Sequence, residues 1–439
     1  METEATSRSV SVEILINFDE TDTLSYAAAD RLERRERAEI REYVQNILRK
    51  RSYLDFLIGH FSNVEMDEMK TSLKNILRLG VYDMLYMDST PDYAAINEAV
   101  KLAKLKLGSR TGDLVNAIMR NLQRDAENLP KPSFEDRNKL VSITFSHPEW
   151  MVQRWRSRFG EREAFALMQA NNKRPVYFVR ANNLRTKTEN FQLRMTKKDI
   201  PFTPSEWLPG YFEVDSVAPF ISNKWLDKGF CQIQDIASGF APFLLDPQPG
   251  ESIHDLCAAP GTKSVVMSDL MNAEGDILAV DISSERLEQL ADSAVRCHAE
   301  NIRIRRGDAT DIELDEADAV LLDAPCTGTG VLSKRADLRW QRDEEELDYS
   351  VELQERLLKS AAGMVKKGGR LVYSTCSLEE EENMGQVSNF LDEHDNFELE
   401  SVEDYLPEEV IIEDGKAYQT FPHEHGCDGH FGVRLKRLK

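Results

Sequence analysis

The stretch AVLLDAPCTGTG (residues 319–330) carries an apolar run into an aspartate, a proline and a cysteine. A second stretch, LVYSTCSLEEEEN (residues 371–383), repeats this plan and also ends its apolar run beside a cysteine. Short apolar runs bounded by proline, glycine and polar residues are typical of buried strands. We therefore predict two similar strands that each end beside a thiol.

Three more strand-like runs precede these two: ESIHDLCAA (251–259), DILAVDIS (276–283) and NIRIRRGDA (301–309). The longer spans between some of the runs have helical patterning. Strands that alternate with helices indicate a parallel, doubly wound sheet. Such a sheet binds ligands at the carboxyl ends of its strands, where the unusual residues of this region lie.

The rest of the chain divides into two parts. Residues 1–128 are predicted to be all-helical, because RAEIREYVQNILRKRSYLDFLIGHF (37–61), MKTSLKNILRLGVYDMLYM (69–87) and AAINEAVKLAKLKLG (94–108) repeat apolar residues at helical spacing. The proline-containing stretch ENLPKPSFEDRN (127–138) is typical of a linker. Beyond it we expect a helix that Gly160 ends or divides, and then a strand, a basic turn and a helix over residues 175–195.

Composition limits the class of protein. A length of 439 residues predicts two or three domains, and 41% hydrophobic with 30% charged residues is typical of a folded, soluble chain. The first residues lack the basic and apolar regions of a signal peptide, and no stretch holds roughly 20 apolar residues. We therefore expect a cytoplasmic protein without a signal peptide or membrane association. The six cysteines lack CxxC pairs and histidine partners at zinc spacing, which favours reduced thiols and no metal site.

The net charge of −22 is unusual for a protein that binds nucleic acid, but the charge is unevenly placed. Residues 131–200 hold 15 Lys and Arg against 7 Asp and Glu. Cations neutralise phosphates, and aromatic rings stack on unpaired bases, so this segment is predicted to contact RNA; a solvated surface over a core is the alternative. The candidate residues are Arg154, Arg156, Arg158, Arg174, Arg180 and Arg185, interleaved with Trp150, Trp155 and Tyr177.

Acidic residues and a small-residue loop follow successive strands of the predicted sheet. The first strand leads into DLCAAPGTKS (255–264), and the next three end near Asp281, Asp308 and Asp323. A carboxylate can accept hydrogen bonds from ribose hydroxyls or an adenine amine, although a helix N-cap is the commoner role of any one acid. The loop is neither a P-loop nor GxGxxG. The set favours a nucleoside-bearing cofactor, S-adenosylmethionine rather than NAD.

Two thiols beside a methyl donor suit one reaction. Carbon 5 of cytosine is a poor nucleophile until a thiolate adds to carbon 6, and an acid such as Asp323 can hydrogen-bond the ring nitrogen where charge develops. One cysteine is needed to attack, and a second can assist release. Inert core is the usual role of a cysteine in an apolar strand, but Cys326 and Cys376 both follow their strands.

These motifs resemble a known family. DAPCTGTG and YSTCSLEEEEN are similar to the paired signatures of RNA cytosine-5 methyltransferases of the NOL1/NOP2/Sun type, and DLCAAPGTKS is similar to their cofactor loop. LKNILRLGVYDMLYM and INEAVKLAKLKLGSRTGDLVNAIMRNL resemble a NusB-like RNA-binding domain. SHPEWMVQRW and QIQDIASGFAPFLLDPQPGE resemble connecting segments of the bacterial RsmB (Sun) subfamily, which methylates one cytidine of 16S ribosomal RNA.

The resemblance implies roles for individual residues. Cys376 is the expected nucleophile, Cys326 assists product release, and Asp323 hydrogen-bonds N3 of the cytosine. Expected contacts of S-adenosylmethionine are Cys257, Ala258, Ala259, Pro260, Gly261, Thr262, Lys263, Asp281, Asp308 and Asp323. The chain departs from the family pattern at Thr262 and Ser264, where GGKT is usual, and at His430, where phenylalanine is usual.

The resemblance also implies a multidomain α and α/β architecture. The expected domains are a NusB-like all-helical RNA-binding domain (1–128), a linker with a basic helical and RRM-like RNA-contacting subdomain (129–240), and a Rossmann-like class I methyltransferase domain (241–439). The expected partner is small-subunit ribosomal RNA, naked or partly assembled, bound by a monomer. Two alternatives stay open: a NusB-like assembly factor with an inactive methyltransferase fold, and a cytosine-5 methyltransferase that acts on transfer RNA.

Overall fold

The computed structural model describes residues 6–87 and 90–438, so the first five residues of the expected helical domain lie outside the described residues. The chain forms two compact units. The first contains residues up to Lys173 together with Leu332–Gln341, and the second contains Arg174–Val331 and Arg342–Lys439. The predicted boundaries at residues 128 and 240 stay a prediction, because the compact units divide the chain at other points.

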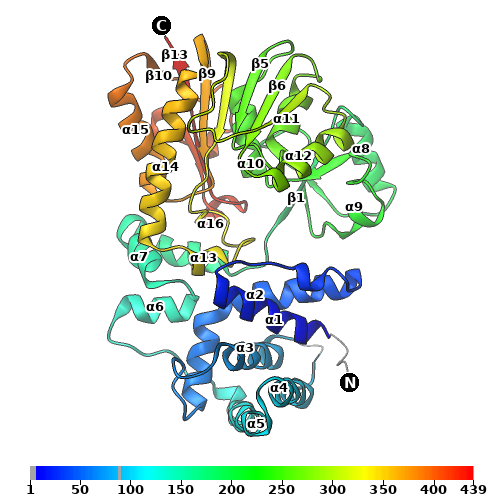
Figure 1. Cartoon of the computed structure of the whole chain (residues 1–439), viewed down its shortest axis with the longest axis vertical. Helices are drawn as coiled ribbons and strands as arrows, with labels where there is room; N and C mark the ends of the chain where they lie inside the picture. Colours follow the sequence, from blue (N-terminus) through cyan, green and yellow to red (C-terminus); the bar gives the residue numbers. More distant parts are fainter. Residues whose placement is uncertain (1–5, 88–89, 439) are drawn as a thin grey trace. The chain divides into compact units, whose positions relative to one another are not determined.

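Helices make up the first unit, as predicted (Figure 1). Their bounds are α1 (Ser7–Thr21), α2 (Arg34–Phe61), α3 (Thr71–Tyr86), α4 (Asp92–Leu107), α5 (Ser109–Arg124), α6 (Arg137–Phe145), α7 (Glu149–Asn171) and the short α13 (Leu338–Gln341). Gly160 interrupts α7 with φ of 78°, as its position in the sequence predicted. Within the ranges that the structure describes, no helix has the length and apolar character that a membrane span requires.

A buried carboxylate organises the core of the helical unit. Asp83 of α3 is fully buried and accepts hydrogen bonds from Tyr43 Oη at 2.9 Å and from Arg8 Nε at 2.8 Å. Nearby, α3 and α4 approach closely, since a Cβ atom on Gly80 would lie 2.9 Å from Ala99 Cβ. Apolar packing and one satisfied charge thus hold α1, α2, α3 and α4 together.

The segment Leu332–Gln341 belongs to the helical unit although its neighbours in sequence belong to the other unit. Arg339 of this segment is fully buried, and burial lowers its pKa to about 9, so it is still a cation at neutral pH. Its guanidinium donates to five oxygen atoms: Arg49 O, Ser146 O, Asn172 Oδ1, Asn171 O and Leu332 O. Trp340 Nε1 also donates to Leu48 O at 2.8 Å. The segment is therefore fixed between α2 and the ends of α6 and α7.

We predict that Arg339→Met destabilises the helical unit by about 3 kcal/mol, because methionine leaves buried carbonyl groups without donors. Hydrogen exchange of α2 and α7 peptides, measured by mass spectrometry, reports this loss. Arg110→Met, on the exposed surface of α5, is the matched control and should change exchange little. Equal protection in the two variants contradicts the prediction.

The second unit begins with a small antiparallel sheet of strand order β2-β3-β1-β4. Its strands are β1 (Tyr177–Ala181), β2 (Thr203–Pro204), β3 (Tyr211–Val214) and β4 (Cys231–Ile233), and its helices are α8 (Thr188–Thr196) and α9 (Ala218–Ser222). Strand β1 and helix α8 confirm the prediction for residues 175–195. Arg180 of β1 forms a buried ion pair, at 2.5 Å, with Asp269 of helix α11 (Thr262–Leu270), which connects the small sheet to this helix.

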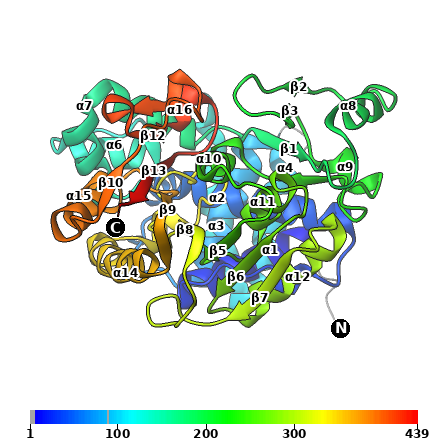
Figure 2. The same cartoon turned by 90° about the horizontal axis from the view of Figure 1, so that it is seen from above.

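The larger sheet has nine strands, with the order β11-β12-β13-β9-β8-β5-β6-β7 and β10 paired to β13 (Figure 2). Its bounds are β5 (Ser252–Leu256), β6 (Asp276–Asp281), β7 (Ile302–Arg306), β8 (Ala317–Asp323), β9 (Val365–Thr375), β10 (Phe397–Leu399), β11 (Ile411–Ile412), β12 (Ala417–Thr420) and β13 (His430–Arg437). Strands β5 to β9 pair in parallel, which confirms the doubly wound core. The four C-terminal strands pair antiparallel and were not predicted.

Helices cover both faces of this sheet. Ala319 and Leu321 of β8 pack in one core with α10 (Ile236–Leu245) and α11 (Thr262–Leu270). Val320 and Leu322 point to the other core, which includes α14 (Glu344–Gly363) and α15 (Met384–Glu393). Alternation along one strand thus makes a three-layer domain with α12 (Ser284–Cys297) beside α11, and it leaves the strand ends free to carry the site.

Candidate functional site

The two cysteines that follow β8 and β9 meet at the carboxyl edge of the sheet. Their Sγ atoms lie 3.1 Å apart, within hydrogen-bonding distance. Both residues are partly exposed and all six cysteines are free thiols. The hydrogen bond to Cys376, together with burial, raises the pKa of Cys326 well above its ordinary value. Cys326 therefore stays a thiol at neutral pH and can donate its S–H to Cys376.

A buried glutamate holds the turns that carry both cysteines. Glu382 Oε1 accepts from Thr327 N at 2.8 Å, and Glu382 Oε2 accepts from Thr327 Oγ1 at 2.5 Å and from Ser377 Oγ. Thr327 directly follows Cys326 and Ser377 directly follows Cys376, so one carboxylate binds both turns. Gln354 of α14 donates a further hydrogen bond to Oε1 at 2.9 Å. Burial raises the pKa of Glu382, although these donors oppose the rise.

Sequence reasoning missed this role of Glu382. Four consecutive glutamates (residues 379–382) have the appearance of a solvated surface, yet Glu382 is fully buried while Glu381 is exposed. Asn383 was missed as well: it accepts from Thr375 Oγ1 at 2.6 Å and donates to Ser377 O at 3.0 Å. The only signal in the sequence is that both residues follow Cys376 within a few positions.

Asp323, the last residue of β8, accepts hydrogen bonds from two side chains. Lys263 Nζ donates to its Oδ2 at 2.5 Å, and Ser374 Oγ donates to its Oδ1 at 3.0 Å. Burial acts to raise the pKa of Asp323, but the positive charge of Lys263 and the hydrogen bonds outweigh it and lower the pKa. Asp323 is therefore ionised in the free protein, and Lys263 balances its charge.

His430 begins β13 and lies next to this carboxylate. Its Nδ1 is 2.9 Å from Tyr418 Oη, and its Nε2 is 3.9 Å from Asp323 Oδ1. Burial, together with the charge of Lys263, lowers the pKa of His430 to about 3, so the ring is neutral at physiological pH. The rings of His430 and Tyr418 are nearly parallel, at 5°. The departure from phenylalanine thus keeps an aromatic ring and adds a polar edge facing Asp323.

The loop after β5 touches the ends of its neighbouring strands. Ala259 N donates to Asp281 Oδ2 at 3.0 Å, and Ala258 N donates to Val280 O at 2.9 Å. Gly261 has φ of +95°, and a Cβ atom there would lie 2.4 Å from Leu290 Cγ. Only glycine fits this turn, which brings the loop against α12 and places the first turn of α11 beside Asp323.

The remaining predicted cofactor residues lie on the same edge. Cys257 follows β5 with φ of 60°, Pro260 follows a cis peptide bond, and Thr262 begins α11. Asp308 lies two residues beyond β7, is exposed, and accepts from Thr310 N at 2.9 Å. Gly307 N donates to Asp281 O at 3.1 Å. The structure therefore joins Ala259 to Asp281 and Lys263 to Asp323, while Asp308 bonds only within its own turn among the contacts described.

Asp255 of β5 lies beneath this loop. It is fully buried, accepts from Ser264 Oγ at 2.5 Å, and its Oδ1 has no hydrogen-bond partner among the described residues. Burial raises the pKa of Asp255 to about 7. Ser264, one of the departures from the family pattern, thus bonds a carboxyl group whose pKa is raised.

The structure corrects part of the predicted RNA-contacting set. Trp155 is 1% exposed and packs on His147, so it is a core residue. Arg180 is 2% exposed and is committed to Asp269. Arg156 donates to Asn138 and lies 3.6 Å from Glu161. Trp155 and Arg180 cannot reach RNA, because the apolar core and a buried ion pair hold them.

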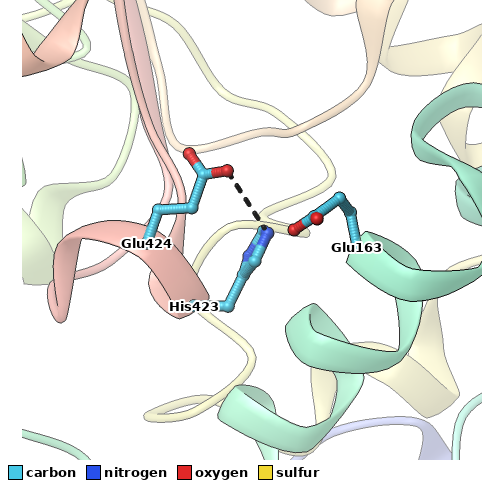
Figure 3. Close-up of side chains that lie close together, drawn as sticks. All are labelled: Glu163, His423 and Glu424. Carbon is cyan, nitrogen blue, oxygen red and sulfur yellow. Dashed lines mark ion pairs between the residues drawn. The ribbon is translucent and has the colours of Figure 1, made fainter.

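The turn that leads into β13 carries the helix α16 (Pro422–His425). Figure 3 shows His423 and Glu424 of this helix, with His423 Nε2 and Glu424 Oε1 3.8 Å apart. Half of the Glu424 side chain is exposed, and the pair is ionic only when His423 is protonated. Exposed pairs contribute little to stability.

Comparisons with known proteins agree with this arrangement. The family profile described as 16S rRNA methyltransferase RsmB/F matches residues 242–436, that of the NusB family matches residues 5–124, and that of the ferredoxin-like domain of RsmF/B-like methyltransferases matches residues 147–219. The probable ribosomal RNA small subunit methyltransferase B of Bacillus subtilis is 30% identical over 98% of each chain. That of Synechocystis is 32% identical over 90% of each chain.

The chain belongs to the RsmB family of ribosomal RNA methyltransferases. Membership confirms the predicted family, the helical NusB domain and the Rossmann-like class I methyltransferase domain. It assigns the chain to methyltransferases that use S-adenosylmethionine. The roles of individual site residues stay predictions.

Solved structures show the same fold. PH0851 aligns over 100% of both chains with a TM-score of 0.82 and 25% identity. A methyltransferase homologue from Pyrococcus horikoshii aligns over 68% of this chain and 98% of its own, with a TM-score of 0.59 and 29% identity. NSun6 of the same organism, crystallised with SFG, covers 66% of this chain and 98% of its own at 22% identity, which supports the fold of the RsmB-like catalytic part alone.

We predict that Glu382→Gln lowers the stability of the second unit by about 2–4 kcal/mol, because the amide nitrogen of glutamine would face donors and could not accept from them. Faster hydrogen exchange in β8 and β9 peptides would measure this loss. Glu381→Gln removes the same charge from an exposed neighbour and is the control. If both variants exchange alike, Glu382 does not hold the two turns.

The stability of the second unit should depend on the protonation of Asp255. Its folded pKa of about 7 lies above the unfolded value of about 3.9, so the native state binds the proton more tightly and loses stability as pH rises from about 4 to 7. Asp255→Asn removes this dependence. Urea unfolding at pH 5 and pH 8 should show the variant gaining about 2 kcal/mol relative to wild type at the higher pH. A pH-independent difference contradicts the prediction.

Proposed function

We propose that the protein methylates carbon 5 of a cytidine in small-subunit ribosomal RNA through a covalent bond between Cys376 and carbon 6. The observation that carries this proposal is the pair of sulfur atoms 3.1 Å apart at the carboxyl edge of the sheet, where β8 ends in Asp323. Methylation of an exocyclic amine or a ribose hydroxyl needs no thiol, whereas methylation of carbon 5 needs a nucleophile on carbon 6.

The sulfur pair supports unequal roles. Cys326 keeps its proton because its pKa is raised, and its S–H can donate to Cys376. The thiolate is the form of a cysteine that attacks. Cys376 Sγ bonds to carbon 6, and the electron pair of the ring double bond moves to carbon 5. Carbon 5 then bonds to the methyl group as the bond between that group and the donor's sulfonium sulfur breaks, which leaves a neutral thioether. A base then takes the carbon 5 proton and the bond from sulfur to carbon 6 breaks, while Cys326 assists release.

Asp323 and Lys263 provide the electrostatic part. When sulfur adds to carbon 6, negative charge develops on N3 of the ring. The proton that Cys376 gives up on attack neutralises this charge, and Asp323 can hold it in a hydrogen bond with N3. Lys263 balances the charge of Asp323 in the free protein and is in contact with it at 2.5 Å. Ser374 fixes the second oxygen of the carboxylate.

The loop residues fit S-adenosylmethionine. When bound, S-adenosylmethionine supplies the methyl group as part of a sulfonium ion. The loop of residues 257–263 includes the small residues Ala258 and Ala259 and a turn that a Cβ atom at Gly261 would block. Backbone N–H groups of Ala259 and Ser283 orient the two oxygens of Asp281, which retain lone pairs for ribose hydroxyls. Asp308 is exposed and can accept from the adenine amine.

The names of the relatives and the NusB match support ribosomal RNA as the substrate, and the complete site argues against an inactive assembly factor. A transfer RNA substrate is the competing outcome. We therefore take small-subunit RNA, naked or partly assembled, as the expected partner of a monomer.

The test is a denaturing gel of protein incubated with unmodified small-subunit RNA and S-adenosylmethionine. Cys326→Ser should accumulate a slow covalent RNA adduct, because attack is intact and release is impaired. Cys376→Ser should form none. Cys427→Ser, a buried thiol elsewhere in the same unit, is the matched control and should resemble wild type.

The reverse pattern, with an adduct only in Cys376→Ser, would assign attack to Cys326 and contradict the mechanism. An adduct only with transfer RNA would contradict the substrate. Methylation of the RNA by Cys376→Ser at the wild-type rate would falsify covalent catalysis by this thiol.

A further inference from the structure

A second concave surface lies in the ferredoxin-like part of the second unit, away from the strand ends that carry the thiols. It is a hollow of about 830 Å³ formed by the loop after β1, by α8 and by Trp225. Its cations are Arg185, Lys187, Arg194, Lys197 and Lys198, and no carboxylate lines it. We refer to this surface as the cationic hollow. Helix α8 and its loop lie at the rim of the small sheet (Figure 2).

Most of these cations are not neutralised by the protein. Among the described residues, Lys187, Arg194, Lys197 and Lys198 form no ion pair, and all four are exposed. Arg185 is held differently, since its Nε donates to Lys228 O at 3.0 Å. Arg185 and Arg194 both lie over the ring of Phe230, at 5.7 Å and 4.7 Å. A chain of net charge −22 thus concentrates unpaired positive charge in one hollow.

The small sheet itself offers no open face at its central strand. Val179 and Ala181 of β1 pack under α8 and α9, while Phe178 packs with α10 on the opposite side. RNA-binding sheets of this size stack bases on exposed aromatic residues, which this buried strand cannot do. Any RNA bound by this subdomain must use another surface.

We infer that the cationic hollow binds the sugar–phosphate backbone of the substrate RNA, an inference that rests on the RNA substrate of the proposed function. Lysine and arginine side chains neutralise phosphates and release counterions. Trp225 is 6% exposed and cannot stack on a base, and the other polar lining groups are amides and a hydroxyl. The hollow therefore holds RNA without reading its sequence, and the thiol site selects the cytidine.

The experiment compares two charge-matched variants of the full-length protein. The first combines Arg194→Gln, Lys197→Gln and Lys198→Gln in the hollow. The control combines Arg305→Gln, Lys359→Gln and Lys367→Gln, which are exposed cations of the same unit outside the hollow. Affinity for unmodified small-subunit RNA is measured by filter binding between about 50 and 200 mM salt, the range in which phosphate contacts weaken steeply.

The hollow variant should bind RNA about 10- to 100-fold more weakly, and the slope of log affinity against log salt should decrease by roughly 2, as expected for three lost phosphate contacts. The control should keep the wild-type slope. Equal slopes in wild type and hollow variant overturn the inference. Binding of poly-glutamate is measured in parallel. If the hollow variant loses affinity for poly-glutamate and not for RNA, the inference is also overturned, because the hollow would then fit an acidic protein.

This result is separable from the proposed function. If the hollow variant shows the predicted salt effect but no RNA is trapped on Cys376, the RNA-binding role of the cationic hollow is supported and the proposed chemistry is contradicted. If RNA is trapped on Cys376 but the hollow variant binds RNA like wild type, the proposed chemistry is supported and the role of the cationic hollow is contradicted.

Discussion

The carboxylate of Glu382 is the constraint on which the sulfur site depends. A buried carboxylate is costly unless donors surround it, and here Thr327, Ser377 and Gln354 supply them. Two of these donors directly follow the two cysteines. Because the buried carboxylate needs both donors, its hydrogen bonds fix the distance between two turns that are 50 residues apart in the chain. The sulfur contact is a consequence of this arrangement.

The same edge of the sheet balances its charges locally. Lys263 neutralises Asp323, and burial keeps His430 uncharged, so the carboxylate faces one cation and one neutral ring. A second cation there would compete for Asp323 and lower its ability to share a proton with a base. Positive charge that can meet phosphates lies instead in the cationic hollow, outside the reaction site. Binding and chemistry are thus served by different surfaces of one unit.

The sequence predicted those features that local patterns encode. Apolar runs ending in cysteine placed β8 and β9, and helical spacing predicted the helices of residues 1–128, because these signals involve neighbours in the chain. The NusB assignment came from the resemblance of motifs in that part. It did not predict Glu382, whose burial depends on α14 closing over a run of four glutamates. It also placed Trp155 and Arg180 on an RNA surface, since composition cannot distinguish an exposed arginine from one paired with a distant aspartate. Of the strands after residue 396, β10 and β11 were missed because two or three residues carry too weak a signal for a strand.

The central claim is that one cytidine of small-subunit ribosomal RNA receives a methyl group on carbon 5 at this site. The most direct measurement is mass spectrometry of nucleosides and mapped fragments after unmodified small-subunit RNA is incubated with the protein and S-adenosylmethionine. The account predicts 5-methylcytidine at a single position. A methyl group on another base, on a ribose, or on cytidines of transfer RNA alone would contradict it.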